Sequence, residues 1–474
     1  MVSGKQASSA GTDAQRRREQ EAAALAEFQT VEAELNTRWP ESTMEPTLDR
    51  IAALVDLLGD PQRAYPVVHV AGTNGKTSTA RMIDALLAEV GLRTGRYTSP
   101  HLRDATERIT LDGAPISHAG YVEVYREIEP YIELLDGRRE PDAPRLSKFE
   151  VLTAMAFAAF ADAPVEVAIV ETGLGGSWDA TNVADGAVTV ITPIGIDHVE
   201  YLGPALAGIA KEKAGIIKPG SIAVMATQDA EAAAVLLERC AGLGATVARQ
   251  GMEFGVLRRD KAVGGQLLKL QGLGGAYDEV FLPVHGAHQA GNAAVALAAA
   301  EALLGAGGDR QLDIDAVRAG FASVTAPGRL ERVRTAPAVL VDAAHNPHGA
   351  RALAAAVSDE FGFRKLVGVL AVLRDKDALA MLQMLEPVLD EVVVTRNSSP
   401  RALDVDELAG LAVQAFGADR VVVEPRLDDA VEEAVRLAEE TDGESEALGG
   451  GGVLITGSVV TAGDARLLFG KDTV

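Results

Sequence analysis

Residues 72–77 (Gly-Thr-Asn-Gly-Lys-Thr) are the segment of this sequence with the clearest capacity for chemistry. They follow an apolar, β-rich run and precede a helical pattern, which is the context that a phosphate-binding loop requires. The glycines let backbone N–H groups converge on phosphate oxygens, and the start of the helix adds a partial positive charge. Lys76 can place its charge on the β- and γ-phosphates, and Thr77 can offer its hydroxyl to Mg²⁺. Val70 stands where the long consensus has glycine, so the loop is a shorter variant, and an ordinary strand-to-helix turn is the alternative.

Oxygen and imidazole groups that could bind a metal occur at the ends of other predicted elements, at Ser99, Glu150 and His198. Mg²⁺ favours oxygen ligands and completes its shell with waters and substrate phosphates. An isolated histidine such as His198 is more often a structural hydrogen-bonding residue, and Asp197 beside it could equally be the ligand. Residue types alone therefore leave the metal ligands open.

Residues 209–217 (Ile-Ala-Lys-Glu-Lys-Ala-Gly-Ile-Ile) place two lysines around a glutamate, ahead of apolar residues. Burial lowers the pKa of a lysine and frees its amine as a nucleophile, so a lysine held neutral near magnesium can react with CO₂. The resulting carbamate is a carboxylate on a long arm, which suits a metal site. A solvated amphipathic helix is the alternative interpretation of this pattern.

Apolar strands that alternate with helices are predicted to position these residues. This alternation is typical of a parallel sheet covered on both faces, whose chemistry gathers at the carboxyl ends of the strands. The strands are expected at residues 66–70, 165–170, 187–192 and 221–225, and helices at 48–58, 78–90 and 289–304. After a break at residues 323–329, a second, smaller α/β unit is expected, with strands at 338–341, 365–370, 391–395, 420–423 and 452–456.

These patterns divide the chain into three parts. Residues 1–43 form an N-terminal extension that is expected to be disordered to about Gln20 and then helical. Residues 44–325 form the larger α/β unit and residues 326–474 the smaller one. A glycine run within residues 440–451 predicts a flexible loop in the smaller unit.

The composition argues against several classes of protein. The 474 residues carry a net charge of −24, which argues against binding duplex DNA or an anionic membrane. Cys240 is the only cysteine, so an intrachain disulfide is excluded and a reducing compartment is favoured. The chain has no run of 18 apolar residues, and its N-terminus does not resemble a signal peptide. We therefore expect a cytoplasmic monomer without nucleic-acid or membrane partners.

Several longer motifs extend the phosphate loop into a pattern that spans the chain. They include residues 69–77, 171–182 (Glu-Thr-Gly-Leu-Gly-Gly-Ser-Trp-Asp-Ala-Thr-Asn) and 342–347 (Asp-Ala-Ala-His-Asn-Pro). Shorter motifs stand at residues 98–102, 107–109, 149–150, 196–198, 212–216, 288–292, 327–331, 375–377 and 457–458. In this order, from about residue 44 to the C-terminus, the sequence resembles the Mur-ligase superfamily, and within it the dihydrofolate synthase/folylpolyglutamate synthase family.

The resemblance implies an α/β fold, with a P-loop-containing Mur-ligase central domain and a smaller Rossmann-like α/β C-terminal domain. It also implies an ATP- and Mg²⁺-dependent ligase that adds L-glutamate to dihydropteroate, to reduced folates or to tetrahydrofolate polyglutamates. Such a ligase first converts the acid into an acyl phosphate, which the amine of glutamate then attacks. The dihydrofolate synthase and folylpolyglutamate synthase activities are both expected in one chain. ATP would bind to the larger domain, and the acceptor site would lie between the two domains.

The resemblance assigns roles to individual residues. The catalytic residues would be Lys76, a carbamylated Lys213, and His345 near the glutamate and γ-phosphate site. ATP would be bound by Gly72, Thr73, Asn74, Gly75, Lys76, Thr77, Ser78, Asn292, Arg329 and Asp342. Magnesium would be ligated by Ser99, Glu150 and His198, together with Thr77. This assignment requires Lys76, Glu150 and His198 to share one pocket. Residues 44–49 and 99–108 would help to hold the pterin-bearing substrate.

The sequence departs from the family pattern at two positions. Ser177 stands where the family usually has arginine, so a charge is missing there. Ala343 stands where the family has glycine, and its methyl group is tolerable only if the backbone keeps a negative φ.

Three other functions compete with the folate ligase. A cell-wall Mur ligase would need a UDP-binding domain before the phosphate loop, and the roughly 70 residues there are too few. A nucleotide-binding P-loop protein without ligase activity would leave the motifs at residues 212–216 and 342–347 unused. A scaffold protein would account for the acidic surface and nothing else.

Overall fold

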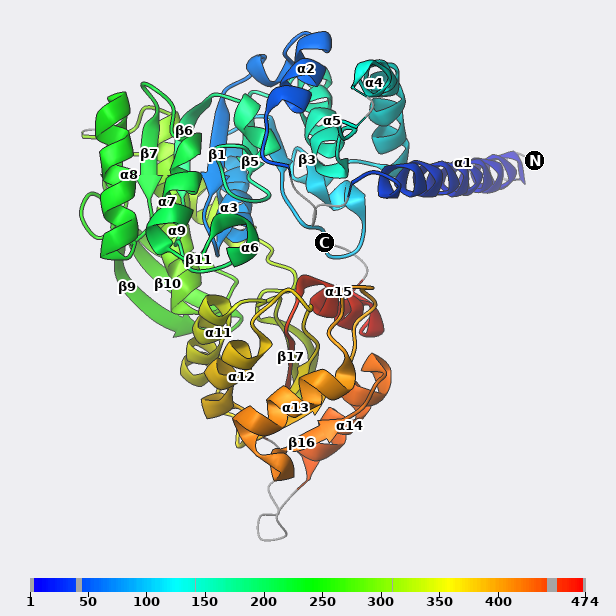
Figure 1. The fold of residues 1–474 in the computed structure, drawn as a ribbon, viewed down its shortest axis with the longest axis vertical. Coiled ribbons are helices and arrows are strands. Elements are labelled where there is room, and N and C mark those ends of the chain that lie inside the picture. Colours follow the sequence, from blue (N-terminus) through cyan, green and yellow to red (C-terminus); the bar gives the residue numbers. More distant parts are fainter. Residues whose placement is uncertain (1–3, 40–44, 141, 309, 441–449, 472–474) are drawn as a thin grey trace.

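The computed structural model describes residues 4–39, 45–140, 142–308, 310–440 and 450–471. It has two lobes, which lie one above the other in Figure 1. The upper lobe contains strands β1 to β11 and the lower lobe strands β12 to β17. The predicted division between residues 325 and 326 falls in the connection between these two sets of strands and stays a prediction.

The upper lobe is built on a mostly parallel sheet of eight strands, counted over the described residues. Each residue of its two central strands is buried, as expected for a sheet covered on both faces. Only β3 and β4, at one edge, run antiparallel to their neighbours. In spatial order the strands are β4 (Ala114–Pro115), β3 (Ile109–Leu111), β2 (Thr94–Tyr97), β5 (Val167–Glu171), β1 (Val67–Ala71), β6 (Gly186–Ile191), β7 (Ile222–Met225) and β8 (Thr246–Arg249).

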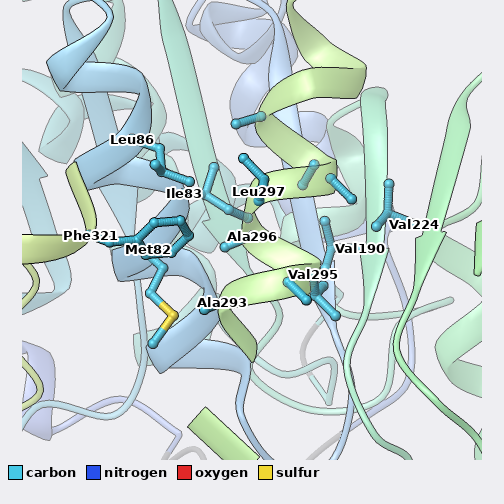
Figure 2. Close-up of a cluster of buried hydrophobic side chains, with 14 of the residues drawn as sticks. Met82, Ile83, Leu86, Val190, Val224, Ala293, Val295, Ala296, Leu297 and Phe321 are labelled. Carbon is cyan, nitrogen blue, oxygen red and sulfur yellow. The ribbon is translucent and has the colours of Figure 1, made fainter. Parts of the chain in front are cut away.

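Helices cover both faces of this sheet. On one face, α3 (Lys76–Glu89) packs against α9 (Ala287–Leu303) and α10 (Ile314–Ala322), and the close-up in Figure 2 shows Ile83 of α3 beside Ala296 and Leu297 of the alanine-rich α9. Alanine side chains let α9 approach its neighbours closely. The other helices of this lobe are α1 (Gly4–Asn36), α2 (Asp49–Leu57), α4 (His118–Arg138), α5 (Lys148–Asp162), α6 (Val199–Leu202), α7 (Leu206–Lys213) and α8 (Ala230–Leu243).

A three-stranded antiparallel sheet extends the upper lobe towards the lower one (Figure 1). It consists of β9 (Gly255–Ala262), β10 (Gly265–Gln271) and β11 (Ala276–Leu282). On β9, Arg259 and Lys261 each form an ion pair with Asp359 of the lower lobe, at 2.8 Å in both cases. The small sheet therefore forms part of the contact between the lobes.

The lower lobe is a six-stranded sheet, counted over the described residues, with helices on both faces. All its strands are parallel except β12 at one edge. In spatial order they are β12 (Glu331–Thr335), β13 (Ala338–Val341), β17 (Gly451–Thr456), β14 (Lys365–Leu370), β15 (Glu391–Val394) and β16 (Val421–Val423). The helices are α11 (Pro347–Glu360), α12 (Ala378–Leu385), α13 (Val405–Phe416), α14 (Leu427–Glu439) and α15 (Val459–Leu468).

The N-terminal extension differs from its prediction. Helix α1 begins at Gly4 rather than near Gln20, and its first half projects away from the rest of the upper lobe in Figure 1. Alanine, glutamine, arginine and glutamate, which favour helix, make up much of this segment. Residues 441–449 of the predicted flexible loop, and Met44 of the predicted substrate segment, lie outside the described residues.

Within the described residues, no helix combines the length and the apolar character that crossing a bilayer requires.

Candidate active site between the two lobes

A pocket lies where the carboxyl ends of the upper sheet face the lower lobe. The phosphate loop and the first turn of α3 form one wall, with all of residues 72–78 contributing. Ser99, His198 and Lys213 line it from other segments of the upper lobe, and Arg329 and His345 from the linker and the lower lobe. The structure thus brings together most of the predicted site residues, from segments that are far apart in the sequence.

The two glycines of the loop are required by their surroundings. Gly72 has φ +150°, and a Cβ atom there would lie 1.9 Å from Oγ1 of Thr192. Gly75 has φ +86°, and a Cβ atom there would lie 2.7 Å from Oδ1 of Asn292. Asn292, a predicted ATP ligand, therefore packs directly against the loop, although it is not among the residues that line the pocket.

Lys76 and Thr77 are the first two residues of α3, and their side chains bind different partners. The Lys76 ammonium donates long hydrogen bonds to the carbonyl oxygens of Gly72 (3.3 Å) and Thr73 (3.4 Å). Thr77 donates from its hydroxyl to Oε1 of Glu171 at 2.9 Å. Both groups stand beside the N–H groups of the first turn of α3, which favour an anion.

Glu171 is a pocket residue that the sequence-based assignment did not include. It is the last residue of β5, which lies beside the phosphate-loop strand β1, and its side chain is buried. Oε2 has no hydrogen-bond partner among the described residues. Burial raises the pKa of this carboxyl group, although Lys76 and Thr77 act in the opposite direction. P-loop enzymes can hold Mg²⁺ with an acidic residue at the end of a neighbouring strand. The sequence shows that Glu171 ends a strand, but only the sheet order shows that this strand lies beside the phosphate-loop strand.

Glu150 is not among the residues that line the pocket with Ser99 and His198, so the geometry gives no support to a shared site that includes Glu150. Its carboxylate completes a capping box at the start of α5, where it accepts the backbone N–H of Ser147 at 2.7 Å. The same carboxylate accepts a hydrogen bond from Nε of Arg50 at 3.1 Å. These contacts connect Glu150 to the start of α5 and to the first turn of α2.

An acidic residue, Asp197, gathers basic groups from both lobes. Its carboxylate accepts a 2.8 Å hydrogen bond from Lys376 and lies 3.8 Å from Nε2 of both His198 and His345. Burial alone would raise the pKa of Asp197, but the three basic neighbours outweigh it and hold this pKa well below its usual range. Asn346 also donates to this carboxylate, at 2.8 Å. Asp197, which itself lines the pocket, therefore connects the two lobes there.

The two histidines of this cluster are neutral at physiological pH. Burial lowers the pKa of His198 to about 4 against the opposing attraction of Asp197. Burial likewise lowers the pKa of His345 to about 4, with Lys376 adding to the effect. A neutral imidazole keeps an unprotonated nitrogen that can accept a proton or bind a metal.

Lys213 ends α7 with its side chain buried behind the phosphate loop. Its Nζ atom donates to the carbonyl oxygen of Gly72 at 2.8 Å. Burial, together with the charge of Lys76, lowers the pKa of Lys213 to about 7, although nearby acids such as Asp197 act in the opposite direction. A large share of this amine is therefore unprotonated at neutral pH.

Asp342, a predicted ATP-binding residue, is not among the residues that line the pocket. Its carboxylate accepts the backbone N–H groups of Leu330 and Ala344, both at 2.8 Å, which fixes the turn that follows Arg329. Ala343 is not among the described non-glycine residues with positive φ. The backbone there therefore accommodates a methyl group in place of the glycine that is usual in the family. Ser177 is bound to the end of α7, since its hydroxyl donates to the carbonyl oxygen of Glu212 at 3.1 Å.

Comparisons with known proteins match both lobes. Residues 143–300 match the Mur ligase middle domain, and residues 328–458 match the Mur ligase glutamate ligase domain. The dihydrofolate synthase/folylpolyglutamate synthase of Mycobacterium tuberculosis is 58% identical over 462 residues, covering 94% of this chain and 95% of that protein. The chain belongs to the dihydrofolate synthase/folylpolyglutamate synthase family. The Bacillus subtilis enzyme of that name is 32% identical over 89% of this chain and 95% of its own length.

Solved structures of this family have the same fold. The M. tuberculosis folylpolyglutamate synthase complexed with ADP has a TM-score of 0.91 and 57% identity, covering 95% of this chain and 100% of that chain. Escherichia coli FolC in complex with DHPP and ADP has a TM-score of 0.80 and 28% identity, covering 94% and 98%. The predicted fold class and the assignment to a ligase family are therefore confirmed.

Proposed function

We propose that this family member uses ATP to join L-glutamate to the carboxyl group of dihydropteroate and of reduced folates and their polyglutamates. The observation that carries the proposal is the single pocket in which the phosphate loop, Lys213, Arg329 and His345 meet. A cell-wall Mur ligase or a P-loop protein without ligase activity is disfavoured, because the folate-enzyme relatives match nearly the whole chain.

The donors in the pocket suit Mg²⁺. We propose that Ser99, His198, Thr77 and Glu171 hold the ion, with Glu171 in place of Glu150. The buried, unpaired Oε2 of Glu171 supports this set, because a buried carboxylate oxygen without a partner is costly unless a cation or donor meets it. Hydroxyl and carboxylate oxygens are ligands that Mg²⁺ prefers, and nucleotide phosphates complete its shell. When bound, the ion would neutralise the charge on the transferring phosphoryl group.

The residues of the chain supply positioning and charge for two successive steps. In the first, a carboxylate oxygen of the acid attacks the γ-phosphorus of ATP and ADP leaves, while Lys76 and Arg329 neutralise the phosphates. In the second, the amine of glutamate attacks the acyl phosphate and inorganic phosphate leaves. The neutral His345, at the lobe contact, is placed to accept the proton that the amine loses.

Contacts across the lobes would couple the chemistry to domain closure. Asn74 of the phosphate loop donates to Asn346 at 3.2 Å and contacts Nδ1 of His348 at 2.8 Å. Arg329, from the linker, and His345, from the lower lobe, line the same pocket as the loop. Separation of the lobes would remove them, which would limit ATP hydrolysis in the absence of glutamate.

The proposed activity is tested by glutamate-dependent release of ADP from purified protein with ATP and Mg²⁺. Dihydropteroate and tetrahydrofolate are supplied in parallel, and the amide products are identified by mass spectrometry. We expect product with both acids. ADP release that does not depend on glutamate or on either acid would refute the proposal. The cytoplasmic location and the monomeric state stay predictions, and size-exclusion chromatography tests the latter.

Replacement of Glu171 by glutamine should raise the Mg²⁺ concentration that gives half-maximal activity by about tenfold or more, since one charged ligand is lost. The matched variant Glu150→Gln should leave that concentration within about twofold, because Glu150 caps α5 outside the pocket. Titration of Mg²⁺ at fixed ATP, supported by Mn²⁺ binding measured with electron paramagnetic resonance, checks both. The opposite ranking of the variants would restore Glu150 as the ligand.

A further inference from the structure

A second hollow adjoins the pocket described above, on the side of α3 that faces the linker between the lobes. The two share Thr77, Ser78 and Arg329 in their linings. The second hollow is also lined by Arg81, one helical turn after Thr77. Two arginines therefore face a space that opens directly onto the proposed phosphoryl-transfer site.

Neither arginine forms an ion pair with a carboxylate among the described residues. The recorded hydrogen bond of Arg81 runs to the hydroxyl of Thr325 at 3.5 Å, the outer limit for such a contact. A guanidinium group offers five donors in a planar fork, so most of the donors of Arg81 have no partner on the chain among the described residues.

The two acids nearest to Arg81 are committed to other partners. Asp84 forms a buried ion pair with Arg96 at 2.5 Å. Glu107 also lines the hollow, but its carboxylate accepts three backbone N–H groups of residues 102–104, at 2.8 to 3.1 Å. These bonds hold the loop that follows Ser99. Although Oδ1 of Asp84 has no hydrogen-bond partner among the described residues, neither acid forms a hydrogen bond or an ion pair with Arg81 there.

The charge of Arg81 is consequently under-compensated. Burial lowers the pKa of Arg81 to about 9, and repulsion from Arg96 and Arg329 contributes, although Glu107 and Asp84 oppose the shift. At neutral pH the group still carries its charge. An anion that enters the hollow would offset this repulsion and accept hydrogen bonds from the guanidinium group of Arg81.

We propose that Arg81 forms a carboxylate subsite for a glutamyl group of the substrates. The phosphates of ATP are already matched by Lys76 and the start of α3, so the anions left to place are carboxylates. Two sources carry one: the α-carboxylate on the glutamyl tail of a folate acceptor, and the incoming glutamate. Dihydropteroate has no glutamyl tail. The subsite rests on the proposed function and adds a specificity residue to it.

Steady-state kinetics of Arg81→Gln with two acceptors tests the subsite. If Arg81 binds the acceptor tail, kcat/KM for tetrahydrofolate falls by about 10- to 100-fold, the usual effect of losing a charged hydrogen bond, while that for dihydropteroate stays within about threefold. If Arg81 binds incoming glutamate, KM for glutamate rises by a similar factor with both acceptors. An unchanged enzyme, a rise confined to KM for ATP, or an equal fall in kcat with unchanged KM values would overturn the subsite.

Two further variants separate a local effect from a change of fold. Arg81→Lys keeps the charge without the fork and should recover part of the loss. Arg258→Gln, at an exposed arginine on β9 that pairs with Asp260, should behave as wild type. Binding of tetrahydrofolate, measured by calorimetry with a non-hydrolysable ATP analogue, should weaken in Arg81→Gln if the tail is the ligand. A wild-type protein that ligates neither acceptor would instead refute the proposed function.

Discussion

Replacement of Lys76 by alanine is expected to lower glutamate ligation by about 10²- to 10³-fold while leaving the fold intact. The ammonium group of Lys76 makes only long hydrogen bonds, of 3.3 and 3.4 Å, to carbonyl oxygens of its own loop. Such bonds yield readily to an anionic partner, with which a charge-assisted bond is shorter and stronger. The variant should therefore lose stabilisation of the transferring phosphoryl group. Glutamate-dependent ADP release measures the loss.

Two control variants show whether a loss of ligation in Lys76→Ala is due to the charge and shape of this side chain. Lys269→Ala removes an exposed lysine of β10 that pairs with Asp278, and should turn over at the wild-type rate. Lys76→Arg keeps a positive charge but not the compact ammonium group, so it should retain only part of the activity. A Lys76→Ala enzyme with wild-type turnover would show that the loop at residues 72–77 does not bind the reacting nucleotide.

The strands that the sequence predicted best are those with continuous apolar runs. Strands β13 and β14 occupy the predicted residues 338–341 and 365–370 without change, because each is largely apolar and buried on both faces. Strand β9 was not predicted, since four of its eight residues are charged and several of its side chains are exposed. Its polar residues make sense only once the lower lobe is in place, because Arg259 and Lys261 pair with Asp359.

The site could be predicted as far as local motifs determine it. The phosphate loop is recognisable because the glycines, lysine and threonine that would bind phosphate and Mg²⁺ all lie within six adjacent residues. The choice between Glu150 and Glu171 could not be made that way, because both are buried glutamates at the ends of elements. Only the order of the sheet, which sets β5 beside β1, places Glu171 at Thr77. The pairing of Asp197 with Lys376 likewise depends on how the two lobes meet.

Replacement of Lys213 by alanine is expected to lower ligation by about 10³-fold or more, and added formate or acetate should restore part of it. The expectation follows if the unprotonated amine adds to CO₂, losing a proton and forming a carbamate that supplies a carboxylate to the site. Its buried position, with Nζ 2.8 Å from the Gly72 carbonyl, is close to the phosphate loop. A small carboxylate can occupy the space that the shortened side chain leaves. Wild-type turnover by Lys213→Ala would remove the carbamate from the mechanism.

Formation of the carbamate should depend on pH in a defined direction. The pKa of Lys213 is lowered to about 7, so the reactive amine is about tenfold more abundant at pH 8 than at pH 6. After removal of CO₂, recovery of activity at a fixed CO₂ concentration should be faster at pH 8 by about that factor. A carbon-13 signal from labelled CO₂ should appear in the wild type and be absent from Lys213→Ala. Equal rates at the two pH values would contradict an amine of lowered pKa.

The same lowered pKa gives a test on stability that does not involve catalysis. Between pH 7 and the ordinary value of 10.5, the unfolded chain holds more protons on Lys213 than the folded chain does. The contribution of this group to the free energy of unfolding therefore rises with pH across that window, and the full penalty of a buried ammonium group applies below it. Lys213→Met cannot ionise and lacks this penalty. In CO₂-free buffer its Tm, relative to wild type, should be higher at pH 6 than at pH 9, and an unchanged difference would show that Lys213 titrates as an ordinary lysine.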